Sequence, residues 1–259
     1  MTATATALPP LRVEPHSEVP LVLYGDFTCP WTYLAQRRLG ELAAAGIRSE
    51  LRAVEHAPSH PRRTGGADGF ADLRAEMDEV VQHLLADEQY PYTLAGFVPH
   101  TYAAVNGYAE AYGAGAGPVA APVLFEAFWR HGMDLDEPKV VRTLLTDAVM
   151  GGTSPSDPLR RWGFVVGVTG APMTTTAWRL VGDWRAEWTR VSHGVVPVLV
   201  QDGRPPIVGV DVVTTLAELV HRLGVHPAQE PQWAAPHARR ALDGHGRTQL
   251  LYPTPAAAS

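Results

Sequence analysis

The sequence predicts an α/β fold in which the two halves of one β-sheet domain are separated by a long helical insertion. Three observations support this prediction. A strand, a helix and a second strand follow one another over residues 20–55, and helical patterns fill residues 70–188. Two further strands and a final helix follow over residues 195–223. We therefore expect a β-α-β half and a β-β-α half that share one sheet.

The first half begins with an apolar strand over residues 20–27. A helix over residues 31–45 follows it, with leucines recurring at near-helical spacing. A second strand covers residues 47–55, and a loop rich in proline and glycine covers residues 57–69. The β-α-β order implies that the two strands are parallel and joined by a right-handed crossover.

The insertion is expected to be all-helical, because caps and breaks divide it into helix-length segments. Asp136 and Asp157 each stand where a helix would begin, and a glycine-rich, hinge-like loop covers residues 113–118. The expected helices are 70–89, 101–112, 120–131, 137–150, 158–168 and 174–188. The aromatic residues of the insertion are expected mainly in its core: Tyr102, Tyr108, Tyr112, Phe125, Phe128 and Trp129.

The second half contains a hairpin, because Asp202-Gly203-Arg204 separates the strands expected at 195–201 and 206–210. A helix over 211–223 completes it. The remaining tail is expected to be partly disordered, although it could pack on a partner subunit, which keeps a homodimer open. The resulting division is a disordered segment 1–18, a sheet domain 19–64 and 189–223, a helical insertion 65–188 and a tail 224–259.

Cys29 is the only cysteine in the chain, and it stands where the first strand gives way to the first helix. It can act as the N-cap, with Pro30 in the first helical position, where a missing N–H costs nothing. The N–H groups and the dipole of the first turn favour a thiolate, and such settings lower a cysteine pKa from about 8.5 to roughly 3.5–7.5. The alternative is a small buried apolar residue.

The segment around Cys29 resembles the active site of DsbA-like proteins of the thioredoxin superfamily. The most similar subgroup reads Asp-Phe-x-Cys-Pro-Trp-Cys-Tyr, and Thr32 stands here in place of its second, resolving cysteine. Kappa-class glutathione transferases and 2-hydroxychromene-2-carboxylate isomerases are similar too, usually with serine at the position of Cys29. The matching residues are Asp26, Phe27, Cys29, Pro30, Trp31 and Tyr33.

A second segment, residues 194–200, carries the same resemblance. In thioredoxin-like folds a cis proline faces the active cysteine, and DsbA-like members often have valine before it, as Val196 stands before Pro197. The resemblance implies a thioredoxin-like fold, a cis Val196–Pro197 bond and a substrate groove lined by Pro30, Trp31 and this pair. It is specific over residues 19–56 and 189–223 and only positional over the insertion.

Two residues near Cys29 have more than one interpretation. The Thr32 hydroxyl could stabilise a Cys29 thiolate, or Thr32 could mark a protein that has lost redox chemistry. Asp26 could relay a proton to or from the thiol, or it could simply cap the turn or pair with a base. The sequence leaves both pairs of alternatives open.

Two further candidates are weaker. Trp31 could shape the surface beside the thiol or serve only in packing, and His193 could exchange a proton with it or lie exposed at a helix end. No metal site is expected: His56 and His60 are four residues apart, but Pro58 between them argues against a shared helical face.

The composition excludes several classes of protein. A net charge of −6 without a run of basic residues argues against nucleic-acid binding. No stretch of about 18 apolar residues predicts a membrane helix. The first twenty residues do not resemble a secretory signal, and a single cysteine forms no internal disulfide, so we expect a cytoplasmic protein.

Three functions agree with these observations. The first is a DsbA-like, monothiol oxidoreductase that uses Cys29 with an external low-molecular-weight thiol such as glutathione, on a small or protein thiol or disulfide substrate. The second is a transferase or isomerase type of enzyme in which Cys29 binds a cofactor thiol. The third is a binding module without catalysis. No tightly bound cofactor is expected in any of them.

Overall fold

The computed structural model describes residues 20–59, 63–64, 71–88, 90, 97–151, 173–192, 194–225, 239–242 and 248–251. Three of the sequence predictions therefore fall outside the described residues: the segment 1–18, the helix expected over 158–168, and His193. The chain divides into two units, Met1–Pro227 and Ala228–Ser259.

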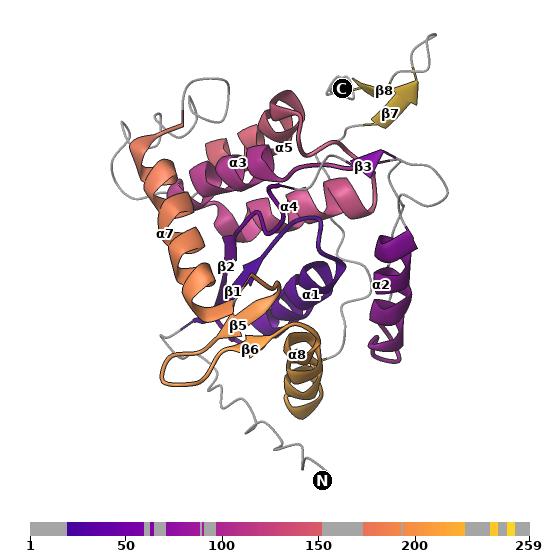
Figure 1. Ribbon diagram of the computed structural model, residues 1–259, viewed down its shortest axis with the longest axis vertical. Coiled ribbons are helices and arrows are strands. Elements are labelled where there is room, and N and C mark those ends of the chain that lie inside the picture. Colours follow the sequence, from indigo (N-terminus) through magenta and orange to yellow (C-terminus); the bar gives the residue numbers. More distant parts are fainter. Residues whose placement is uncertain are drawn as a thin grey trace, which may run out of the picture. The chain divides into compact units, whose positions relative to one another are not determined.

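The first unit contains a four-stranded sheet of order β2-β1-β5-β6 (Figure 1). Its strands are β1 (Leu21–Gly25), β2 (Ser49–Ala53), β5 (Val198–Val200) and β6 (Ile207–Val208). β1 pairs in parallel with β2 and antiparallel with β5, and β5 pairs antiparallel with β6. The predicted β-α-β crossover and hairpin are thus confirmed, although each strand is shorter than expected.

The helices of the sheet domain are α1 (Pro30–Ala44) and α8 (Val210–Arg222), which pack against each other. The insertion contains α2 (Ala71–Gln82), α3 (Tyr102–Gly113), α4 (Gly117–Trp129), α5 (Pro138–Gly151) and α7 (Thr175–Ser192). Figure 1 shows α3, α4 and α5 gathered together, with α7 alongside the sheet.

Two details of the insertion differ from the sequence prediction. α2 ends seven residues earlier than expected, and a small antiparallel ladder joins β3 (Arg63–Thr64) to β4 (Phe97–Val98). Two residues on each side are too few to show a strand period, so no pattern in the sequence indicated this ladder. It matters because β4 brings Val98 to the wall of the pocket described below.

The insertion is fastened to the segment that carries Cys29. The Trp129 indole donates to the Phe27 carbonyl at 2.9 Å, and the Tyr90 hydroxyl donates to the Pro30 carbonyl at 2.9 Å. Of the six aromatic residues expected in the core, Tyr108, Phe125, Phe128 and Trp129 are buried, whereas Tyr102 is 62% exposed. These bonds fix the backbone on both sides of the cysteine.

A buried ion pair holds α1 in place. Arg38 of α1 and Glu88 have fully buried side chains, and Arg38 makes two bonds to the Glu88 carboxylate, at 3.1 and 2.6 Å. Its remaining donors reach the carbonyls of Val213 in α8 and His83 after α2, each at 2.6 Å. One guanidinium therefore links α1 to α8 and to the segment that follows α2.

The second unit contains a hairpin of β7 (Arg239–Leu242) and β8 (Thr248–Leu251). The rest of the expected tail lies outside the described residues. Among the helices that the structure describes, none has the length and apolar character needed to cross a membrane.

Candidate active site

Cys29 is the N-cap of α1, as the sequence predicts. Its backbone is extended, with φ −85° and ψ 120°, and Pro30 follows at the start of the helix. The Cys29 N–H donates to the Asp26 carbonyl at 3.1 Å, and the Cys29 carbonyl accepts the first helical bond from Tyr33 at 3.1 Å. A tight turn thus carries the chain from β1 into α1 with the thiol at the junction.

The thiol lies against the Val196–Pro197 peptide, whose bond is cis. The distance from Cys29 Sγ to the Val196 carbonyl oxygen is 3.9 Å, a contact in which the thiol is the donor. The Trp188 indole donates to the Val195 carbonyl at 2.8 Å and so stabilises the backbone next to this cis peptide. The structure therefore brings together the two segments that carried the family resemblance.

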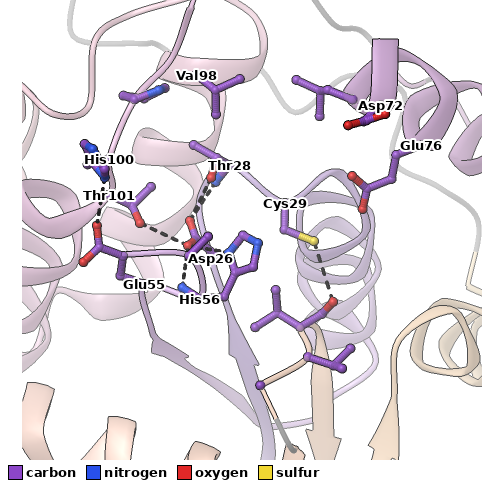
Figure 2. A pocket seen from close by; sticks show the side chains of 16 residues that line it. Asp26, Thr28, Cys29, Glu55, His56, Asp72, Glu76, Val98, His100 and Thr101 are labelled. Atoms are coloured by element: carbon purple, nitrogen blue, oxygen red, sulfur yellow. Dashed lines mark hydrogen bonds and ion pairs between the residues drawn. The ribbon is translucent and has the colours of Figure 1, made fainter. Parts of the chain in front are cut away.

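A pocket of about 410 Å³ opens beside the thiol. Figure 2 shows carboxylates and imidazoles around it, contributed by the ends of β1 and β2, by α2 and by the segment after β4. The residues lining it are Asp26, Thr28, Cys29, Glu55, His56, Ala57, Asp72, Leu73, Glu76, Val98, Pro99, His100, Thr101, Gly194, Val195 and Val196.

The expectation of a thiolate at Cys29 is wrong for this arrangement. Cys29 is only 5% exposed, and burial raises its pKa to about 12, with the negative charge of Glu76 acting in the same direction. The backbone and hydroxyl of Thr32 lower the pKa, but by less. Desolvation disfavours the charged form and here exceeds the effect of the helix N-terminus, so the resting group is a protonated thiol.

Thr32 is fully buried, and its hydroxyl makes no hydrogen bond of normal geometry within the described part of the chain. The hydroxyl is nevertheless close enough to the sulfur to lower the pKa of Cys29. The Thr32 methyl group packs over β1 at Gly25, where an added Cβ would stand 2.1 Å from that methyl carbon. Thr32 thus places a buried hydroxyl beside the thiol.

Asp26 is a buried carboxylate that binds three segments of the chain. Its Oδ1 accepts from the backbone and hydroxyl of Thr28, at 3.0 and 3.1 Å. Its Oδ2 accepts from the His56 backbone at 3.0 Å, from His56 Nδ1 at 2.8 Å and from the Thr101 hydroxyl at 3.1 Å. Burial alone would raise the pKa of Asp26, but these partners, chiefly His56, hold it below its ordinary value.

His56 lines the pocket as a titratable base. The sequence analysis considered it only as a metal ligand and so missed it as a site residue. Burial would lower its pKa, but the hydrogen bond and charge of Asp26 raise it above the ordinary value. Because Nδ1 is engaged by Asp26, Nε2 is the nitrogen left for the pocket. In the view of Figure 2 the imidazole lies between Asp26 and Cys29.

The Asp26–His56 pair predicts a pH-dependent stability. The lowered pKa of Asp26 adds stability above the carboxyl's unfolded pKa of about 3.9, and this is lost as the pH falls through its folded value. The raised pKa of His56 adds stability below its unfolded pKa of about 6.5, and this is lost as the pH rises through its folded value. Asp26→Asn should therefore lower the unfolding free energy by about 2–4 kcal/mol between these limits.

Denaturant unfolding of wild type and Asp26→Asn, from about pH 3 to about pH 9, measures this difference. The difference should be largest in the middle of the range and shrink toward both ends. Asp78→Asn, on the exposed surface of α2, is the matched control and should change stability little. A constant difference across the range would contradict the ion pair.

The other predicted site residues are placed differently. Neither Pro30 nor Trp31 is among the residues that line the pocket. Trp31 is 7% exposed and packs edge-on against His83, with ring centroids 5.3 Å apart. Pro197 is buried and is not among the lining residues, and its carbonyl accepts from the Gly209 N–H at 2.8 Å. The interpretation of Trp31 as a packing residue is therefore the one that its contacts favour.

Comparison with known proteins identifies the fold. The chain is similar to a 2-hydroxychromene-2-carboxylate isomerase at 21% identity and TM-score 0.52, over 79% of this chain and 95% of that one. It is similar to a probable DsbA oxidoreductase from Streptomyces coelicolor at 13% identity and TM-score 0.52, over 90% and 100%. It is also similar to the cytosolic disulfide reductase DsbM from Pseudomonas aeruginosa with GSH at 18% identity and TM-score 0.50, over 80% and 100%.

No protein-family model and no curated protein matches the chain. The structural likeness, at low identity, shows the fold: a thioredoxin-like domain with a helical insertion, as predicted. The chain shares this fold with structures described as an isomerase, a probable DsbA oxidoreductase and a disulfide reductase.

Proposed function

We propose that this protein is a thiol–disulfide oxidoreductase that acts through Cys29 alone. The observation that carries the proposal is the position of the Cys29 sulfur, 3.9 Å from the Val196 carbonyl and at the wall of a pocket of about 410 Å³. A lone cysteine forms no internal disulfide, so its partner sulfur comes from another molecule, in keeping with a reducing, cytoplasmic setting.

The reaction is a pair of thiol exchanges. The Cys29 thiolate attacks one sulfur of a substrate disulfide, the Cys29–substrate S–S bond forms, and the other half leaves as a thiolate that takes up a proton. A low-molecular-weight thiol then attacks the substrate sulfur of the mixed disulfide, becomes disulfide-linked to that half of the substrate and releases Cys29 as a thiol. Each exchange breaks one S–S bond and forms another, so one half of the substrate ends as a free thiol and the other half as a mixed disulfide with the small thiol.

Deprotonation is the step that the pocket must assist, because the resting thiol is protonated. In this proposal His56 accepts the proton through Nε2, with Asp26 stabilising the resulting imidazolium. A positioned histidine can take up a proton from a thiol and later return it. Thr32 then donates its hydroxyl to the thiolate. The Val196 carbonyl loses the S–H donor and becomes available to a substrate N–H.

One observation favours a second function. The raised pKa keeps Cys29 protonated, so its S–H group is a hydrogen-bond donor. The first function must remove this proton before the reaction, whereas a second function can use the S–H group as it is. In a transferase or isomerase type of enzyme, the same S–H group would donate to the sulfur of a bound thiol and would never form a covalent bond. The two functions therefore differ in whether Cys29 becomes disulfide-linked.

Intact-mass measurement after exposure to a small disulfide tests the proposal. The disulfides are oxidised glutathione, the neutral bis(2-hydroxyethyl) disulfide and the cationic cystamine, each at the same concentration. We expect one adduct per chain with at least one of them, absent in Cys29→Ser and reversed by excess thiol. Binding of a thiol without any adduct would support the second function instead. The absence of both an adduct and thiol binding would support a binding module without catalysis.

A further inference from the structure

Thr101 stands at the N-cap position of α3, but its side chain does not cap that helix. A threonine at an N-cap ordinarily accepts a hydrogen bond from a backbone N–H of the first turn. The Thr101 hydroxyl forms no such bond and donates to Asp26 Oδ2 at 3.1 Å instead. The insertion therefore contributes a side-chain donor to the carboxylate that binds His56.

Glu55, which lies just after the end of β2, caps α3 in place of that hydroxyl. Its carboxylate accepts hydrogen bonds from the backbone N–H groups of Thr101 and Tyr102. These groups lie at the start of the helix, where a carboxylate also interacts favourably with the helix dipole. Because Glu55 satisfies this end of α3, the Thr101 hydroxyl is not needed to begin the helix.

Asp26 Oδ2 is shared between the insertion and the base of the proposed reaction. It accepts from the Thr101 hydroxyl at 3.1 Å and from His56 Nδ1 at 2.8 Å. Asp26 and Thr101 are both 2% exposed, so water has little access to this oxygen. A donor that stabilises a carboxylate also makes it a weaker acceptor for its other partners. The Thr101 bond accordingly reduces the stabilisation that Asp26 gives to a protonated His56.

We propose that Thr101 is a positioning residue whose hydroxyl shares the Asp26 carboxylate with His56, and so links the docking of the insertion on the sheet to the basicity of this histidine. The inference rests on the proposed function, in which His56 takes the proton from Cys29, and it adds a control on that step. While the hydroxyl occupies Asp26 Oδ2, more of the His56 population stays neutral. The neutral imidazole is the form that accepts a proton.

The other charged groups around His56 do not depend on this hydroxyl. Burial lowers the pKa of His56, whereas the hydrogen bond and charge of Asp26, followed by the charges of Glu76 and Glu55, raise it. The ionisable groups that line the pocket with His56 are Asp26, Cys29, Glu55, Asp72, Glu76 and His100. A substitution that removes only the hydroxyl leaves all of them in place. A change in the titration of His56 therefore reports on the shared oxygen.

Titration of His56 by nuclear magnetic resonance tests the inference in Thr101→Val, which keeps the shape of threonine and removes the hydroxyl. We expect the measured pKa of His56 to rise by about 0.5–1 unit, a fraction of the roughly 1–2 units that a hydrogen bond to a charged group is worth. The chain has 11 histidines, so the signal is assigned by its absence in His56→Gln. An unchanged or lowered pKa overturns the inference.

Three further variants control this measurement. Thr101→Ser keeps the hydroxyl and should titrate like the wild type. Thr189→Val makes the same chemical change on the exposed surface of α7, where the hydroxyl donates to the Arg185 carbonyl at 2.8 Å, and should leave the pKa of His56 unaltered. Thr101→Ala removes the hydroxyl with a smaller side chain. If the valine variant does not fold, the alanine variant must raise the pKa of His56, or the inference is wrong.

The rate of adduct formation with neutral bis(2-hydroxyethyl) disulfide, measured against pH, separates this inference from the proposed function. In Thr101→Val the ascending limb of the rate should move to higher pH together with the pKa of His56, whereas a purely structural defect would lower the rate equally at every pH. A limb that stays in place while this pKa moves overturns the role of Thr101 in the reaction.

The titration and the adduct can also fail independently. If the pKa of His56 rises in Thr101→Val but the wild type forms no adduct with any of the three disulfides, the monothiol reaction is wrong and the link between Thr101 and His56 stands. If adducts form on Cys29 but this pKa is the same in both proteins, the reaction stands and the link is wrong.

Discussion

Thr32→Val should slow the alkylation of Cys29 by about 10- to 150-fold at a fixed neutral pH, the loss expected for one hydrogen bond to a charged group. Valine keeps the shape of threonine, including the methyl group that packs over Gly25, and removes only the hydroxyl. The thiolate of Cys29 would then lack the donor that lowers its pKa in the wild type. Iodoacetamide rates, measured by mass against pH, give the thiolate fraction directly.

Thr32→Ser is the matched control, because serine retains the hydroxyl and loses the methyl group. It should react within a few-fold of the wild type, although the lost methyl group destabilises the core by about 1 kcal/mol. Equal rates for Thr32→Val and the wild type would show that Thr32 only fills space. That result would favour the interpretation in which the absent resolving cysteine marks lost chemistry.

Glu88→Gln should lower the free energy of unfolding by about 3–5 kcal/mol, because it leaves the Arg38 guanidinium buried without its counter-charge. Both side chains are fully buried, and Glu88 also accepts from the Leu85 backbone at 3.0 Å. Urea denaturation followed by circular dichroism measures the loss. A decrease below about 1 kcal/mol, the usual value for an exposed pair, would contradict the described burial.

The double variant Arg38→Met with Glu88→Leu removes both charges together. It should be considerably more stable than Glu88→Gln, because apolar side chains of similar size often replace a buried pair at little cost. Glu187→Gln provides a comparison on the surface, since Glu187 pairs with Arg52 where both side chains are partly exposed. This change should lower the free energy of unfolding by about 1 kcal/mol or less.

Sequence analysis predicted those parts of the site whose local structure is determined by residues adjacent in the sequence. Cys29 as N-cap and Pro30 in the first turn follow from residue types at adjacent positions. The contact of Cys29 with Val196 was expected from the family resemblance and depends on the pairing of β1 with β5. The fold could be predicted for the same reason, because each half shows its own strand and helix patterns.

The parts that were missed depend on distant residues. The protonated state of Cys29 results from burial by several segments and from Glu76 on α2, which no local pattern places near the sulfur. His56 was dismissed because Pro58 interrupts a helical metal site, although a different signal was available. Asp26 follows β1 and His56 follows β2, and the ends of parallel neighbours meet at one edge of a sheet.

The close approach of Thr32 to Gly25 makes these two positions interdependent. A side chain at position 25 would occupy the space of the threonine methyl group, so only a residue smaller than threonine could then stand at position 32. In a set of related sequences, variation at the two positions should accordingly be correlated. The hydrogen atom of a single glycine thus decides which residues can stand next to the sulfur.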